Sequence, residues 1–127
     1  MAASLEMPIL IVEDFSTMAR IVRALLAKVG FKNVDHADDV PAAFAKLRER
    51  RYGLVLSDWN MEPISGYTFL KELRCDPTLK SIPFIIMTAD AKAENVVAAK
   101  KAGVDNYIVK PFNATALKAK IDAVFNG

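Results

Sequence analysis

Residues 54–58 read Leu54-Val55-Leu56-Ser57-Asp58, a run of aliphatic side chains that ends in a serine and an aspartate. An unbroken aliphatic run of this length is typical of a strand covered on both faces, as in a parallel sheet flanked by helices. The aspartate would then lie at the carboxyl end of the strand, where open α/β sheets bind their ligands. The stretch therefore predicts both the class of fold and the place to look for function.

The same pattern recurs on both sides of this stretch. Apolar runs of the same kind lie at 9–12, 84–87 and 107–109, and a weaker, more polar run at 34–37 suits an edge strand. Apolar residues recur at helical spacing over 17–29, 40–50, 66–74, 92–102 and 114–125. Strand and helix thus alternate five times, which predicts an α/β protein with a parallel sheet, right-handed crossovers and helices on both faces.

Signals for the ends of helices agree with these ranges. Gly30 is suited to terminate the first helix in a left-handed conformation, and Pro41 is tolerated in the first turn of the second. Asn113 is a suitable N-cap for the last helix. On the first helix we expect one buried stripe, made of Ile21, Val22, Leu25, Leu26 and Val29.

Composition limits the class of protein. The chain has 127 residues, of which 53% are hydrophobic and 25% charged, as in soluble globular proteins. A net charge of only +2 argues against a nucleic-acid binder, and the single cysteine, Cys75, excludes an internal disulfide. No signal peptide or membrane span is expected. We expect one cytoplasmic domain over 1–127, monomeric, with a flexible segment at 1–6 and an output that acts through its own surface.

Polar residues follow four of the five expected strands: Glu13 and Asp14, Asp58, Thr88, and Lys110. Because the carboxyl ends of parallel strands share one edge of the sheet, these side chains are expected to converge there. Clustered carboxylates repel one another and favour a hard cation, Mg²⁺ before Ca²⁺ when all ligands are oxygens. A carboxylate in such a site can act as a nucleophile toward a phosphoryl group, whose charge the lysine would neutralise.

These residues also carry a family resemblance. Asp14, Asp58, Thr88 and Lys110-Pro111-Phe112 match the pattern of two-component receiver domains. The runs 14–18, 57–61 and 109–112 are most similar to the CheY-type receivers of chemotaxis, and the resemblance covers roughly residues 7 to 126. It implies the flavodoxin-like (βα)5 doubly wound sandwich, with the strand order 2-1-3-4-5.

The resemblance also implies a role for each residue of the cluster. Asp58 looks like the phospho-acceptor, and Lys110, joined to Pro111 by a cis bond in the family, looks like the lysine that contacts the phosphate. Thr88 looks like the switch hydroxyl, and Tyr107 like the aromatic residue that changes rotamer with it. Mg²⁺ would be held by the side chains of Glu13, Asp14 and Asp58 and by the backbone carbonyl of Asn60.

The function implied is that of a response regulator rather than a conventional enzyme. It would take a phosphoryl group from a CheA-like histidine kinase in a self-catalysed, Mg²⁺-dependent reaction and lose it slowly, with or without a phosphatase. The face made by the fourth helix, fifth strand and fifth helix would then bind the flagellar motor switch. A phosphate sink or phosphorelay shuttle without motor binding is the alternative. A haloacid-dehalogenase-type hydrolase is disfavoured, because Asn60 stands where those enzymes need a second aspartate.

Two residues depart from the family pattern. Glu13 stands where the family commonly has aspartate, and Glu62 follows Met61 where the family usually has proline. We expect Glu62 to tune metal affinity or phosphate lifetime without abolishing function. His36, in the predicted edge strand, is expected to face solvent and to take no part in catalysis.

Overall fold

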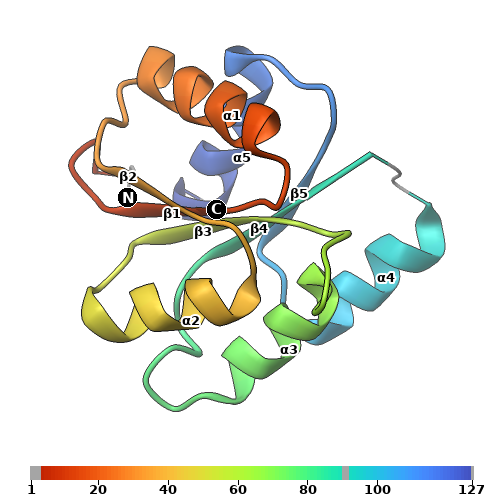
Figure 1. Cartoon of the computed structure of the whole chain (residues 1–127). Coiled ribbons are helices and arrows are strands. Elements are labelled where there is room, and N and C mark those ends of the chain that lie inside the picture. Colours follow the sequence, from red (N-terminus) through yellow and green to blue (C-terminus); the bar gives the residue numbers. More distant parts are fainter. Residues whose placement is uncertain (1–3, 90–91, 127) are drawn as a thin grey trace.

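The computed structural model, which describes residues 4–89 and 92–126, contains a five-stranded parallel sheet between two layers of helices (Figure 1). The strands are β1 (Ile9–Val12), β2 (Val34–Ala37), β3 (Leu54–Asp58), β4 (Phe84–Thr88) and β5 (Asn106–Val109). The helices are α1 (Ser16–Val29), α2 (Val40–Glu49), α3 (Gly66–Cys75), α4 (Ala93–Ala102) and α5 (Ala114–Asn126). The strand order is β2-β1-β3-β4-β5, so the predicted fold class, alternation and topology are confirmed.

Each strand contributes to two separate cores, one on each face of the sheet. Helices α1 and α5 cover one face, and α2, α3 and α4 cover the other (Figure 1). Side chains alternate between the faces: Ile9 and Ile11 pack on the α1–α5 side, whereas Leu10 and Val12 pack on the opposite side. Burial on both faces explains why β1, β3 and β4 are unbroken apolar runs.

The predicted helix ends are found where the sequence signals placed them. Gly30 adopts φ 113° and donates its N–H to the carbonyls of Leu26 and Ala27, closing α1. The side chain of Asn113 accepts a 2.8 Å hydrogen bond from the N–H of Ala116 at the start of α5. Asp39 caps α2 in the same way and was not predicted from sequence.

One member of the predicted stripe on α1 was wrong. Val22 and Leu26 are fully buried, but Ile21 is 47% exposed. Successive residues of a helix are about 100° apart, so Ile21 and Val22 cannot both point at the centre of one core. The hydrophobic pattern on this helix is wider than the face that the sheet and α5 cover.

The N-terminal segment is tied to the body of the protein from Ser4 onward. Ser4 accepts a backbone hydrogen bond from Met7, and the side-chain amide of Asn33 donates to the carbonyl of Glu6 over 3.1 Å. Residues 1–3 lie outside the described part of the chain, so the flexibility expected for 1–6 stays a prediction.

Candidate functional site

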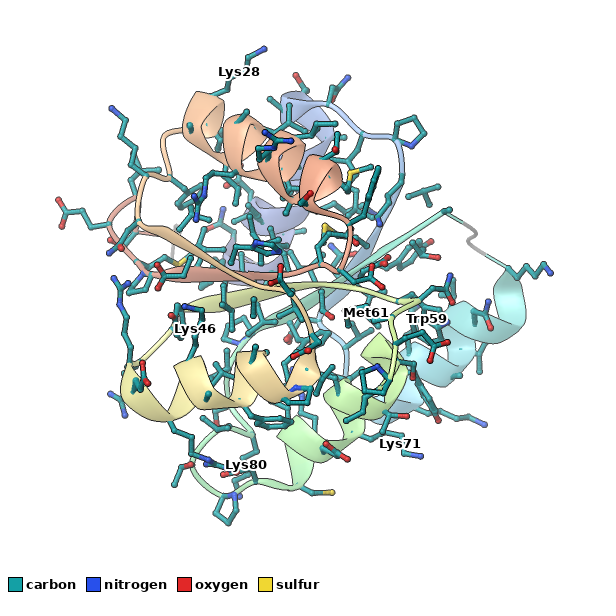
Figure 2. The ribbon with its side chains drawn as sticks, in the orientation of Figure 1. Lys28, Lys46, Trp59, Met61, Lys71 and Lys80 are labelled. Carbon is teal, nitrogen blue, oxygen red and sulfur yellow. The ribbon has the colours of Figure 1, made fainter. Side chains whose placement is uncertain are left out.

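The strands bring the predicted polar residues to one edge of the sheet. Val12 is paired with Ser57, Asp58 with Met87, and Thr88 with Val109. The residues that end or follow these strands therefore stand at the same level, next to one another. The loop from β3 to α3 borders the same end, where Figure 2 shows Trp59 and Met61.

Three carboxylates converge at this edge. Oxygen atoms of Glu13, Asp14 and Asp58 all lie within 4.8 Å of one another. Glu13 and Asp58 are buried, with 1% and 7% exposure, whereas Asp14 is exposed. The cluster offers oxygen ligands and one side open to solvent, a donor set that fits Mg²⁺ with some coordination positions left to water or substrate.

Lys110 bridges the two buried acids. Its Nζ atom lies 2.8 Å from Glu13 Oε1 and 2.9 Å from Asp58 Oδ1. Burial alone would lower the pKa of Lys110, but its hydrogen bonds to Asp58 and Glu13 outweigh burial and raise the pKa above its ordinary value. The ammonium group therefore stays charged and offsets part of the carboxylate repulsion.

Glu13 is the most deeply buried acid of the cluster. Burial raises the pKa of its carboxyl group, as does the neighbouring charge of Asp58, against the lowering effect of the hydrogen bond from Lys110. Its second oxygen accepts a hydrogen bond from the N–H of Phe15. The longer side chain that replaces the usual aspartate thus reaches Lys110 while still turning back to its own loop.

The loop after β3 forms a shallow cleft beside the acids. The cleft measures about 310 Å³ and is lined by Asp14, Asn60, Met61, Glu62 and Ser65. Glu62 is exposed, so the departure from the family pattern adds a carboxylate to the rim of this cleft. The bonds Glu62–Pro63 and Lys110–Pro111 are both cis, the second as the resemblance implied.

Thr88 and Tyr107 lie on the side of the site that faces α4. Thr88 is buried, with 7% exposure, and Tyr107 is half-buried. Both line a narrow cavity together with Trp59 and residues of α4. The Nζ atom of Lys120 on α5 lies 4.8 Å from the centroid of the Tyr107 ring. Tyr107 thus lies between the cavity beside Thr88 and the surface of α5.

His36 was misjudged from sequence. Its side chain is 24% exposed rather than facing solvent, and its Nε2 atom lies 2.8 Å from the backbone carbonyl oxygen of Glu13. The pattern of β2 could not show this contact, because it depends on which residue of β1 pairs with His36. Only the pairing of β1 with β2 places the ring beside the acidic loop.

The comparisons with known proteins agree with one another. The family described as the response regulator receiver domain matches residues 9–122. The chain is 48% identical over 119 residues to chemotaxis protein CheY-3 of Vibrio cholerae, covering 94% of this chain and 92% of the relative. It is 44% identical over 119 residues to chemotaxis protein CheY of Pseudomonas aeruginosa, covering 94% and 96% of the two chains.

Solved structures give the same result. Chemotaxis protein CheY4 of Vibrio cholerae superposes with a TM-score of 0.87 at 28% identity, covering 94% of this chain and 98% of that one. The receiver domain of sensor histidine kinase PA1611 from Pseudomonas aeruginosa, solved with a magnesium ion in its active site cleft, gives 0.85 at 25% identity, covering 96% and 99%. Among the helices of the described residues, none has the length and apolar character needed to cross a membrane.

Proposed function

Because the chain belongs to the response regulator receiver domain family, we propose that it accepts a phosphoryl group on Asp58 and changes its surface in response. The observation that carries this proposal is the cluster at the end of β3. There the buried carboxylate of Asp58 lies among two further acids and is contacted by Lys110. The relatives named as chemotaxis proteins support a role as a CheY-like regulator.

The transfer step is a substitution at phosphorus. An oxygen of Asp58 attacks the phosphorus atom of a phosphohistidine, the P–N bond breaks, and an acyl phosphate forms as the imidazole leaves. The ammonium group of Lys110 would contact the transferred phosphoryl group and offset its negative charge. The hydroxyl of Thr88 would donate a hydrogen bond to a phosphoryl oxygen. Water later cleaves the acyl phosphate and regenerates the carboxylate.

A magnesium ion would be held by Glu13, Asp14, Asp58 and the backbone carbonyl of Asn60. When bound, it would supply positive charge that neutralises the phosphoryl oxygens. Asp14 is the open member of this set, since the other two carboxylates already contact Lys110. The exposed position of Asp14 would allow the ion to exchange with solvent without unfolding the site.

The output follows from the added charge. A phosphoryl group brings about −1.5 to −2 charge units to Asp58. Thr88 would move toward that charge, and Tyr107 would occupy the space next to it, changing the face formed by α4, β5 and α5. We propose that this face binds the flagellar motor switch and that a CheA-like histidine kinase supplies the phosphoryl group.

The acceptor is tested by replacing Asp58. With acetyl phosphate and Mg²⁺, the wild-type protein should incorporate phosphate that is released at alkaline pH, and Asp58→Asn should incorporate none. Asp122→Asn is a suitable control, because it removes a carboxylate that pairs with Lys118 on the surface of α5. Labelling that persists in Asp58→Asn would exclude Asp58 as the acceptor.

The output is tested by capture with and without beryllofluoride, which imitates the phosphoryl group. Motor-switch protein retained only in its presence supports the proposed output, and Tyr107→Ala should weaken that retention. Rapid phosphotransfer from the kinase without any motor binding would instead identify the protein as a phosphate sink or shuttle.

A further inference from the structure

His36 extends the hydrogen bonding between β1 and β2 beyond the end of the sheet. The N–H of Glu13 donates to the carbonyl of Ala37 over 3.1 Å, and β2 ends at that residue. The chain then turns toward α2, and among the described residues no backbone N–H bonds to the carbonyl of Glu13. The imidazole of His36 approaches that carbonyl instead, at 2.8 Å.

The chemistry of this contact fixes the direction of the bond. A carbonyl oxygen can only accept, so the Nε2 atom of His36 carries the proton and donates it. A neutral imidazole is sufficient for this. The charged neighbour that faces the ring is Asp38, whose Oδ1 atom lies 3.6 Å from the same nitrogen and whose side chain is 81% exposed.

The carbonyl in question belongs to the peptide unit that joins Glu13 to Asp14. A peptide unit is planar, so a donor that fixes its oxygen also fixes the orientation of the N–H and the Cα of the next residue. His36 therefore acts on the direction in which the chain leaves Glu13 and presents Asp14. Glu13 itself is held on its other side by Ala37, and its carboxylate by Lys110.

We propose that His36 is a positioning residue for the metal site, holding the peptide between Glu13 and Asp14 so that both acids present their oxygens to one cation. This inference rests on the proposed function, since it assumes that the acids bind Mg²⁺. Residues that orient ligands without touching the metal commonly affect its affinity. Here the effect passes through the backbone rather than through a ligand side chain.

The test compares two substitutions with the wild type. His36→Gln keeps an N–H donor at similar reach, whereas His36→Leu keeps apolar bulk and removes the donor. Mg²⁺ is titrated at constant pH and ionic strength, at a temperature where all variants are folded, by the fluorescence of Trp59, the only tryptophan. We expect His36→Leu to weaken Mg²⁺ binding by roughly two- to tenfold, as loss of one hydrogen bond would, and His36→Gln to restore it.

Asp35→Asn is the matched control on the same strand. Asp35 pairs with Arg50 and Tyr52 and is bonded to none of the three acids of the metal site in the contacts described. This variant should lose stability toward urea and keep the wild-type affinity for Mg²⁺. Equal loss of affinity in Asp35→Asn and His36→Leu would show that any damage to β2 has the same effect and would overturn the inference.

A readout without metal accompanies the titration. In the metal-free protein, His36→Leu should shift the amide resonance of Asp14 and speed its hydrogen exchange, while His36→Gln should leave both near their wild-type values. If the wild type binds Mg²⁺ and His36→Leu binds it with the same affinity, the inference about His36 is overturned while the proposed metal dependence stands. A wild-type protein that binds no Mg²⁺ would overturn the proposed metal dependence and this role with it.

Discussion

The backbone of Asp58 leaves no room for a side chain at position 66. A Cβ atom built on Gly66 would lie 2.0 Å from the carbonyl oxygen of Asp58, and the N–H of Gly66 donates to the carbonyl of Trp59 over 2.9 Å. The start of α3 is thus pressed directly onto the loop that carries the proposed acceptor. The obstacle is backbone, so it cannot be relieved by a change of rotamer.

We therefore expect Gly66→Ala to displace the loop after β3. The cost should reach the upper part of the 1–3 kcal/mol typical of overpacking, and phosphorylation by acetyl phosphate should slow. Gly53→Ala is the control, since the atoms nearest to its new methyl group belong to the side chain of Met7, at 3.0 Å, and not to the backbone. Urea unfolding measures the loss of stability, and the Trp59 emission spectrum reports the displacement of the loop. Equal spectra in the two variants would contradict this account.

Tyr52 gives a prediction for pH dependence. Burial, together with the hydrogen bond to Asp35, raises the pKa of Tyr52 to about 12. The folded state thus holds this proton more tightly than the unfolded state, whose phenol has a pKa near 10. The resulting stability is complete below pH 10 and is lost as the pH rises through 12.

Urea unfolding at pH 8 and pH 11 tests this sign. The wild type should lose more stability between the two values than Tyr52→Phe, which has no phenolic proton. When Asp35 is replaced by Asn, the loss of stability with pH should differ less between the protein with Tyr52 and the one with Phe at this position. The reason is that an amide oxygen is a weaker acceptor for the Tyr52 hydroxyl than the Asp35 carboxylate, which it contacts at 2.5 Å. A Tyr52→Phe variant with the same pH dependence as the wild type would assign the alkaline loss to other groups.

Among the elements, α3 is fastened to the far end of the sheet by one side chain. Arg74, whose side chain is 19% exposed, donates to the carbonyls of Gly103, Lys80 and Ile82 and to the carboxylate of Asp105. The same oxygen of Asp105 accepts the N–H of Phe84 at the start of β4. The guanidinium group thus joins α3, the C-terminal end of α4 and the starts of β4 and β5.

Arg74→Met should destabilise the protein by roughly 2–4 kcal/mol, because four acceptors, of which the carbonyl of Ile82 is part-buried, lose charge-assisted hydrogen bonds at once. Arg74→Lys should recover only part of this, since an ammonium group cannot reproduce the planar array of donors. Arg48→Met is the control: the Arg48–Asp76 pair lies at the surface, so its loss should cost much less than the loss of Arg74. Urea unfolding measures all three, and similar losses for Arg74→Met and Arg48→Met would refute the bracing role.

The elements themselves could be predicted because their signals are local. The aliphatic runs of β1, β3 and β4 lie within four or five residues, and Gly30 and Asn113 mark helix ends by their own conformational preferences. The contacts of Arg74 could not be predicted in this way. Two of its partners lie about thirty residues further along the chain, and no pattern near Arg74 points to them.

At the scale of the whole molecule, the site is assembled from loops that only the strand order brings together. The convergence of Glu13, Asp58 and Lys110 was predictable because each ends or follows a strand and parallel strands share one functional edge. The part played by His36 was not, because it depends on the pairing of β1 with the edge strand. The reactive residues at strand ends can thus be predicted from the sequence. A contact from a neighbouring strand, such as that of His36, can be predicted only when the pairing register of the two strands is known.

We expect the same assembly to couple the proposed metal binding to global stability. Three carboxylates within 4.8 Å of one another are opposed by the ammonium group of Lys110 alone in the contacts described, so the metal-free fold carries uncompensated repulsion. Mg²⁺ that binds only the folded state should stabilise it by about 2.7 kcal/mol at a concentration one hundred times the dissociation constant. Addition of EDTA should reverse the gain.

Asp14→Asn separates the two parts of this effect. Removing the exposed charge should raise the stability of the metal-free protein by roughly 1 kcal/mol, the energy of two charges about 4 Å apart in water, and should abolish most of the gain from Mg²⁺. NaCl at matched ionic strength controls for screening, which acts on every exposed charge. If Asp14→Asn is less stable than the wild type without metal and still gains from Mg²⁺, the carboxylates are held together by packing rather than by a cation.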